Sequence, residues 1–301
     1  MDLAYLHEFC RTFDYPAAAE TALTAGAQAI AADPEAGRVF DALVAEYERL
    51  GTDTDLNAAL RELRRHDGHL AVPAETAELL LFIAYSAHLH TLYMARGVSE
   101  AIYFDSMCDL KWKLTECYEC RGIWGSFVAD WFPRLFQMTR FALGRLQYEL
   151  IQMPQITSED GKYAFDGDKA VNVHIPSAGP LRQDTLDESF RRAALFFAPE
   201  FPDGTVRFVC HSWLLTPMHA QMLPETSGIR LFMRYFDIFG FKEDPKDSDL
   251  WRVFNTTDLH DVDALPADTG LRRAYIRLLR SGGHSGAAWG VRMMRVPEQG
   301  E

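Results

Sequence analysis

The spacing of apolar residues changes near residue 140. Before that point, apolar side chains recur every three or four residues, and Ala, Leu, Glu and Arg are frequent, which indicates amphipathic helices. After it, apolar and polar residues alternate over residues 143–152, with the period of a β-strand. The change of period predicts a helical domain over residues 1–138 and a sheet-containing domain over residues 139–301.

The first part carries the expected signals for helix starts and stops. Pro16 and the dipeptide Asp33-Pro34 open helices, and Gly51 ends one. The segment 73–96 is apolar on nearly all sides, so we expect it to be the central helix of a bundle. It is interrupted by polar residues and is too short to span a bilayer.

The second part predicts the order β-β-β-α-β-α-β-α-β. Strands at 143–152, 162–165 and 170–175 form an antiparallel meander, with Asp166-Gly167 as a hairpin turn. A helix from Asp184 or Thr185 to Ala198 then leads to a strand at 206–215 that is apolar on both faces. This succession implies a right-handed crossover and a parallel pair. Further elements are expected at 226–235 (helix), 236–241 (strand), 269–281 (helix) and 287–296 (strand). We therefore predict an α+β protein.

The balance of charge argues against anionic partners. The chain has 30 Lys and Arg against 43 Asp and Glu, a formal charge of -13. This charge repels phosphate backbones and anionic lipid surfaces, so we expect neither a nucleic acid nor a membrane as partner. The first residues have no signal-peptide pattern, and five cysteines without framework spacing fit a reducing compartment. A cytoplasmic location is expected.

The cysteines do not predict a metal site. Cys117 and Cys120 form a C-x-x-C pair with Cys108 upstream, but all three fall in an expected helix. No second pair of cysteines or histidines completes four zinc ligands. We expect structural cysteines and no bound metal.

Several phrases of the second part resemble a known family. They are Leu143–Glu149, Val173–Pro176, Asp187–Phe190, Cys210–Leu215 and Leu223–Glu225. Together with the order of elements, they are similar to the bacterial acyltransferase domain-containing proteins. In that family, a helical N-terminal region precedes a GNAT-like C-terminal domain, a mixed sheet flanked by helices.

The resemblance implies acyl transfer from a thioester, usually acyl-CoA, to an amine. In GNAT proteins two central strands splay apart and hold the acyl-pantetheine arm, and here these strands would be 170–175 and 206–215. Backbone N–H groups near Val173 and Ile175 would polarise the thioester carbonyl. The family's diphosphate loop corresponds to residues 177–182. Its candidate cofactor-binding residues are Ser177, Gly179, Leu181 and Arg182.

That loop departs from the family pattern of Gln/Arg-x-x-Gly-x-Gly/Ala, because Pro180 removes one backbone donor. The N-terminus of the following helix still offers N–H groups to an anion. The departure leaves two other acyl donors open, an acyl-carrier protein and an aminoacyl-tRNA, although the acidic charge argues against tRNA.

Strand parity selects candidate catalytic residues. Glu149 and His174 lie on the polar faces of their strands, and they share a cavity if these faces point the same way. We therefore expect Glu149 to act as the base, directly or through water, with His174 beside it. The alternative is that this face is simply solvated. In that case Arg145 is the ion-pair partner of Glu149.

His211 and Ser212 are adjacent on one expected strand, so they project to opposite faces and form no nucleophile–base dyad. His211 alone is a third catalytic candidate, with Trp213 on its face; the alternative is a core histidine.

Three functions follow from these observations. The first is an N-acyltransferase that moves an acyl group from acyl-CoA to a small-molecule amine by direct attack. The second is the same fold served by an acyl-carrier protein. The third is a non-catalytic ligand-binding protein that retains the GNAT fold.

Overall fold

The computed structural model describes residues 1–66, 70 and 72–297. The chain divides into two units, Met1–Ala142 and Leu143–Glu301. The first is built from helices and the second from a mixed sheet with helices, which confirms the predicted α+β class. The domain boundary after residue 138 stays a prediction of the sequence.

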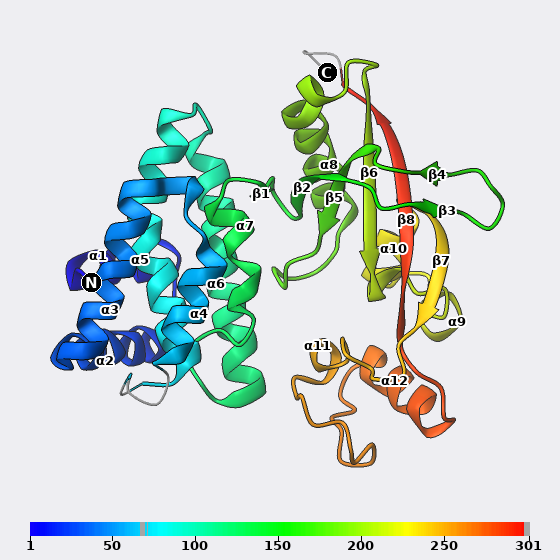
Figure 1. Cartoon of the computed structure of the whole chain (residues 1–301). Coiled ribbons are helices and arrows are strands. Elements are labelled where there is room, and N and C mark those ends of the chain that lie inside the picture. Colours follow the sequence, from blue (N-terminus) through cyan, green and yellow to red (C-terminus); the bar gives the residue numbers. More distant parts are fainter. Residues whose placement is uncertain (67–69, 71, 298–301) are drawn as a thin grey trace. The chain divides into compact units, whose positions relative to one another are not determined.

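The helical unit is organised around helix α5 (Ala74–Ala95), most of which is buried, as expected for segment 73–96. The other helices are α1 (Leu3–Thr12), α2 (Ala17–Ala32), α3 (Pro34–Leu50), α4 (Leu56–Arg65), α6 (Glu100–Arg121) and α7 (Pro133–Phe136), followed by the short strand β1 (Arg140–Ala142). Helices α1, α2, α3, α4 and α6 all contact α5 (Figure 1). Among the described residues up to 138, no strand is formed.

Local sequence explains where these helices begin and end. The carboxylate of Asp33 accepts hydrogen bonds from the N–H groups of Glu35 and Ala36 and so caps α3, with Pro34 in its first turn. Gly51 ends α3 with a φ of 58°, a conformation that glycine adopts at little cost. Late in the unit, Phe82 of α5 packs against Phe132 and Phe136. This part of the chain therefore belongs to the core of the bundle.

The second unit is built on a sheet with the strand order β2-β5-β6-β8-β7. The strands are β2 (Gln147–Gln152), β5 (Lys169–His174), β6 (Thr205–Ser212), β7 (Asp237–Glu243) and β8 (Gly286–Arg295). Strands β5 and β6 are parallel, and the other neighbours are antiparallel. Helix α8 (Gln183–Phe197) joins the parallel pair, so the predicted strand–helix–strand crossover is confirmed.

The predicted three-stranded meander is wrong. Strand β2 pairs directly with β5, whereas β4 (Ala164–Phe165) pairs with β3 (Ile156–Thr157) in a separate hairpin (Figure 1). The hairpin turn lies between β3 and β4, where the hydroxyl of Ser158 accepts from the N–H of Tyr163 at 2.9 Å. At the expected turn, the N–H of Gly167 instead donates to the carbonyl of Met153, so this segment folds back on the end of β2.

The two faces of the sheet have different covers. On one face, Tyr148 of β2 and Phe208 of β6 pack against Phe190 of α8. On the other face, Val209 and Val291 pack in one cluster that includes Phe165 of the β3–β4 hairpin. Side chains alternate along each strand, so each inward position can be assigned to one of these faces.

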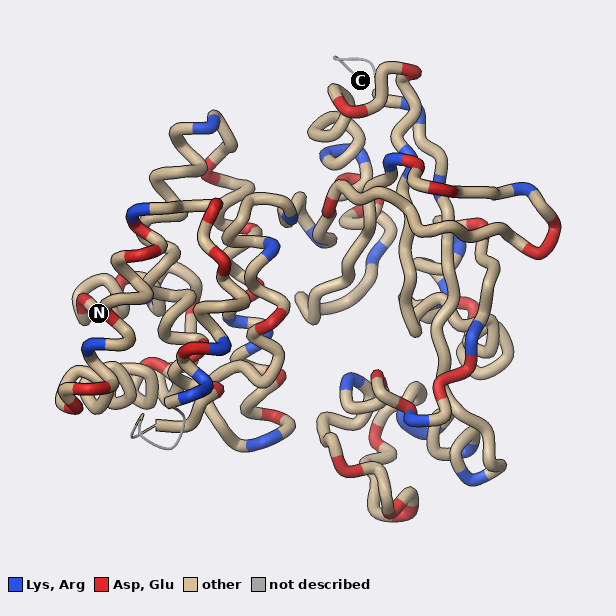
Figure 2. The backbone as a smooth tube through the Cα atoms, viewed as in Figure 1, with Lys and Arg blue, Asp and Glu red and all other residues tan. Residues whose placement is uncertain are grey.

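The remaining helices follow β6 in the chain, two before β7 and two between β7 and β8. They are α9 (His219–Met222), α10 (Gly228–Met233), α11 (Trp251–Phe254) and α12 (Gly270–Arg280). Helix α10 and strand β7 occupy shorter or shifted ranges than the sequence predicted. Helix α11 lies within segment 243–268, for which the sequence predicted neither a helix nor a strand. Figure 2 shows Lys and Arg interleaved with Asp and Glu along the backbone of both units.

None of the helices formed by the described residues has the length and apolar character needed to cross a bilayer.

Candidate active site

Strands β5 and β6 separate toward their carboxyl ends. The parallel pairing comprises only the register pairs Val171 with Phe208 and Asn172 with Val209. Beyond these pairs, β5 runs on to His174 and β6 to Ser212 without further pairing between them in the described chain. The ends of the two central strands are therefore splayed.

A cleft of about 520 Å³ lies at these splayed ends. The chain segments after both strands line it, together with the start of α10 and Arg252 of α11. The lining residues are Arg145, Ile175, Pro176, Ser177, Gly179, Pro180, Leu181, Trp213, Leu214, Thr226, Ser227, Gly228, Ile229 and Arg252. Apolar side chains and two arginines, Arg145 and Arg252, line the cleft and suit a ligand with an apolar arm and an anionic group.

Strand β6 ends earlier than predicted, and this shapes the cleft. The hydroxyl of Ser212 accepts a hydrogen bond from the N–H of Leu214 at 3.2 Å and starts a 3-10 turn over Trp213–Leu215. Trp213 is thus part of the turn and not a continuation of the strand that carries His211. The expectation that both share a strand face is corrected.

Two buried polar residues support this turn. His219 is fully buried, and its Nδ1 lies 3.2 Å from the carbonyl of Leu214 while its Nε2 lies 2.8 Å from the hydroxyl of Tyr275. A carbonyl only accepts, so Nδ1 carries the proton and Tyr275 donates to Nε2. Burial lowers the pKa of His219 to about 4, so the ring is neutral near pH 7.

The loop on the other wall is fixed by Arg145. Its guanidinium donates to the carbonyl groups of Pro176 at 2.9 Å, Gly179 at 2.7 Å and Pro180 at 3.3 Å. The sequence predicted a strand through Arg145 and, as the alternative to a catalytic Glu149, an ion pair between these two residues. Instead, a turn closed by the N–H of Leu143 and the carbonyl of Leu146 precedes β2, and Arg145 points to the loop.

A polar group lies on the sheet face opposite α8. Glu149 is the register partner of Asn172 in the β2–β5 pair, and Gln147 is the partner of His174. The Nε2 atom of His174 lies 3.3 Å from Oε2 of Glu149 and 3.3 Å from the amide nitrogen of Asn172. The side chains of His174 and Glu149 are 14% and 7% exposed. The carboxylate and imidazole therefore do share one face, as strand parity indicated.

Gln147 adds an acceptor to this group. Its amide oxygen is buried and has no hydrogen-bond partner among the described residues. An unsatisfied buried oxygen costs free energy unless a ligand or water supplies a donor.

His211 lies on the same face, two residues beyond the last parallel pair, just as His174 does on β5. Its ring packs 4.7 Å from that of its register partner Trp289. Burial lowers the pKa of His211, and the charge of Asp249 opposes this shift. The two histidines thus lie on either side of the divergence between the strands.

The expected binding residues fall into two groups. Ile175, Ser177, Gly179 and Leu181 line the cleft. Val173 is buried in β5 opposite Tyr148, and Arg182 is an exposed N-cap residue of α8 whose Nε lies 3.5 Å from Asp184. Neither of these two is among the lining residues of the cleft.

Sequence reasoning missed a part of the wall. Arg252 lies in segment 243–268, for which the sequence predicted neither a helix nor a strand. Residues 226–229 were assigned to the first turn of a helix over 226–235, whereas Ser227 caps α10 by accepting from the N–H of Ile229. The glycine at position 228 was the available signal in the sequence. The structure gives its reason, because an added Cβ would lie 2.8 Å from the carbonyl of Leu181.

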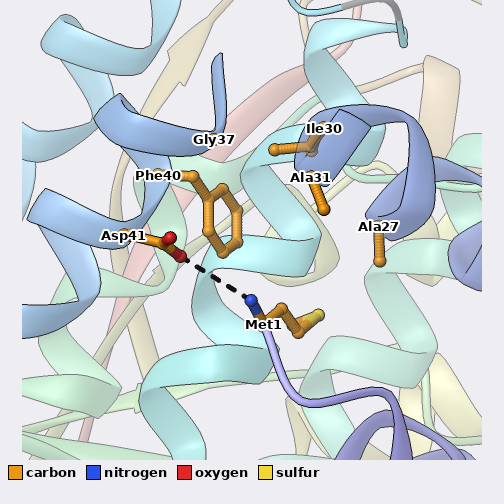
Figure 3. Close-up of a pocket in the computed structure, with 7 residues that line it drawn as sticks. All are labelled: Met1, Ala27, Ile30, Ala31, Gly37, Phe40 and Asp41. Carbon is orange, nitrogen blue, oxygen red and sulfur yellow. Dashed lines mark ion pairs between the residues drawn. The ribbon is translucent and has the colours of Figure 1, made fainter. Parts of the chain in front are cut away.

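Two pockets in the helical unit are less suited to chemistry. One, shown in Figure 3, is about 90 Å³ and holds the Met1 ammonium 3.7 Å from Asp41. The other, about 450 Å³, is lined by ten residues of which none is titratable, among them Gly26, Thr76 and Trp124. Neither combines a substrate-sized cavity with a proton acceptor.

Among the described residues, no group of three or more His, Cys, Asp or Glu side chains is placed to hold a metal ion.

A splayed parallel pair with a cleft at its ends, followed by a loop and a helix, is the architecture of GNAT-type acyltransferases. The model of the GNAT-like C-terminal domain matches residues 140–292, and the model of the N-acyltransferase N-terminal domain matches residues 4–138. The chain therefore belongs to the GNAT-like C-terminal domain family, and it is an acyltransferase, as its sequence predicted.

Solved structures agree with this fold. An acyltransferase in complex with decanoyl-CoA and teicoplanin matches with a TM-score of 0.71 and 23% identity, covering 97% of this chain and 87% of the other. A mutant acyltransferase in complex with octanoyl-CoA matches with a TM-score of 0.73, 23% identity and the same coverage. An acyltransferase in complex with decanoyl-CoA matches at 0.60 and 24% identity, covering 97% and 99%. No curated protein matches the chain.

Proposed function

We propose that this acyltransferase moves an acyl group from acyl-CoA to the amine of a small molecule. The observation that supports an amine as acyl acceptor is a group of hydrogen-bond acceptors on one sheet face. They are the carboxylate of Glu149, the imidazole of His174 and the amide oxygen of Gln147, which has no partner among the described residues. An amine brings N–H donors to such a group, whereas a thiol or an alcohol acceptor brings fewer donors.

Acyl-CoA as donor is supported by the cleft and by the neighbours. The cleft has an apolar wall for an acyl-pantetheine arm and lies at the end of the splayed strands. The structural neighbours contain octanoyl-CoA or decanoyl-CoA, and one contains teicoplanin beside decanoyl-CoA. None of these observations supports an acyl-carrier protein as partner.

The proposed reaction is a direct attack. The amine nitrogen forms a bond to the thioester carbonyl carbon, the C–S bond breaks, and the product is an amide and CoA thiol. The proton that leaves the attacking nitrogen passes to the Glu149–His174 pair, and the departing thiolate takes up a proton from water or from this pair. Backbone N–H groups of the β5 end, near Val173 and Ile175, stabilise the oxyanion. His211, across the divergence, orients the acceptor.

The test is a thiol-release assay. Octanoyl-CoA and decanoyl-CoA are mixed with the protein and a panel of small-molecule amines, and free CoA is measured beside the amide product. We expect amine-dependent release of CoA and formation of one amide for each thiol. Binding of CoA in calorimetry without any release would show a non-catalytic binding protein instead.

A further inference from the structure

Arg145 holds three carbonyl groups of one short loop. Its three guanidinium nitrogens each donate to a different acceptor, the carbonyls of Pro176, Gly179 and Pro180, 31 to 35 residues away in the chain. A planar fork with donors in fixed directions imposes the positions of the groups it binds. Arg145 therefore sets the orientation of the peptide planes in this loop.

Because each peptide unit is planar, the direction of its carbonyl also determines the direction of the N–H group of the next residue. All peptide bonds of the described chain are trans, so the carbonyl of one residue and the N–H of the next point in opposite directions. With the carbonyls of Pro176 and Pro180 turned to Arg145, the N–H groups of Ser177 and Leu181 point away from it. The third carbonyl, of Gly179, precedes Pro180, which has no N–H.

The rest of the loop supports the same picture. The N–H groups of Ala178, Gly179 and Leu181 have no acceptor in the part of the chain that the structure describes. Gly179 has a φ of +90°, which a residue with a side chain adopts only with strain. Successive N–H groups in such a turn form a concave site for an anion. The loop is also part of the cleft wall.

We propose that Arg145 is a positioning residue for the donor: it holds loop 176–181 so that the backbone N–H groups of this loop bind the diphosphate of acyl-CoA. The inference rests on the proposed use of acyl-CoA. Pro180 is compatible with this role, because it lacks an N–H but keeps the backbone carbonyl that Arg145 binds. Burial lowers the pKa of Arg145 to about 10, so the cation is retained at neutral pH and adds positive charge behind the loop.

The test compares two donors that differ only in the anionic part. Decanoyl-CoA carries the diphosphate and the nucleotide, and decanoyl-pantetheine keeps the acyl arm but lacks both. In Arg145→Lys and Arg145→Met, we expect the KM for decanoyl-CoA to rise about tenfold or more while the KM for decanoyl-pantetheine changes less than about twofold. A lysine cannot bond three carbonyls in this geometry, so it should not rescue the effect.

Two further variants make the result specific. Gly179→Ala leaves Arg145 in place but strains the turn, so it should show the same selective loss of decanoyl-CoA. If the Arg145 variants fail to fold, Gly179→Ala still tests whether the conformation of this loop determines the binding of decanoyl-CoA. Arg191→Met removes an exposed arginine of α8 that is paired with Glu188, and it should leave both KM values unchanged. This control excludes a general effect of lost positive charge.

The outcomes separate this inference from the proposed function. If the Arg145 variants raise the KM equally for both donors, or raise it for neither, the proposed role of Arg145 is wrong. If the wild-type protein binds CoA in calorimetry but turns over neither donor, the proposed function falls. The Kd values for CoA in the same variants then decide the role of Arg145, which requires weaker binding by about tenfold. If the wild-type protein binds no CoA, both proposals are wrong.

Discussion

The Nε2 atom of His174 lies 3.3 Å from Oε2 of Glu149, on two neighbouring antiparallel strands. Both side chains are largely buried, and both are on the sheet face that faces away from α8. The pair connects a carboxylate with an imidazole at the end of β5. Neither residue is among those that line the cleft, although Ile175, which follows His174, is one of them. Its role in proton transfer can be tested residue by residue.

Glu149→Gln should lower the turnover of acyl-CoA with an amine by about a hundredfold or more, since loss of a general base costs about 10²–10⁴ in rate. The amide keeps the volume and can still hydrogen-bond to His174, so the free energy of unfolding should change by less than about 1 kcal/mol. Steady-state kinetics and urea unfolding measure the two quantities. Normal turnover together with a lowered stability would assign Glu149 a structural role only.

His174→Asn is the companion change. If the two residues act as one proton-accepting unit, the double variant should be about as slow as the slower single variant, because residues that act together are not additive. If they act independently, the losses multiply. A double variant with the wild-type rate would remove this polar face from the mechanism and direct attention to His211.

His219 should make the stability of the protein depend on pH. Burial lowers the pKa of His219 from the ordinary histidine value of about 6.5 to about 4, so the unfolded chain binds a proton over a range of pH in which the folded protein does not. The stability from this group is complete above pH 6.5 and is lost as the pH falls toward 4, up to about 3 kcal/mol.

Urea unfolding of the wild-type protein and of His219→Gln at several pH values checks this. The variant should be less stable at pH 7, because the hydrogen bonds to Leu214 and Tyr275 are altered, but its stability should fall less steeply below pH 6.5. Parallel curves for the two proteins would contradict the assignment of a neutral buried ring.

Gly228→Ala should disturb the cleft from the side of α10. The new Cβ would lie 2.8 Å from the carbonyl of Leu181, so either the loop or the helix must move. We expect a several-fold higher KM for acyl-CoA and a loss of stability of about 1–2 kcal/mol. Gly270→Ala is the matched control, since no heavy atom lies within 4 Å of its added Cβ. Its effects should stay within about 0.5 kcal/mol.

The sequence predicted most of the elements of the fold. The period of three to four residues identified the helical unit, the capping residues Asp33 and Gly51 marked helix ends, and a strand apolar on both faces indicated the parallel partner β6. These signals are local: each depends on residues within about one turn or one strand. The same parity argument placed Glu149 and His174 on a common face, because side-chain alternation is fixed by backbone geometry.

Pairing and side-chain partners depended on tertiary structure. Ala164 and Phe165 pair with β3 and not with β5, because the turn after Ser158 closes a hairpin that the nearby signal Asp166-Gly167 obscured. Arg145 alternates in the sequence like a strand residue, yet it belongs to a turn and binds carbonyl groups more than thirty residues away. The sequence by itself determined where helices and strands form and which residues share a strand face, since local backbone geometry sets both. Only the tertiary structure decided which strands are neighbours and which loop Arg145 holds, because those contacts join segments whose spacing in the sequence carries no periodic signal.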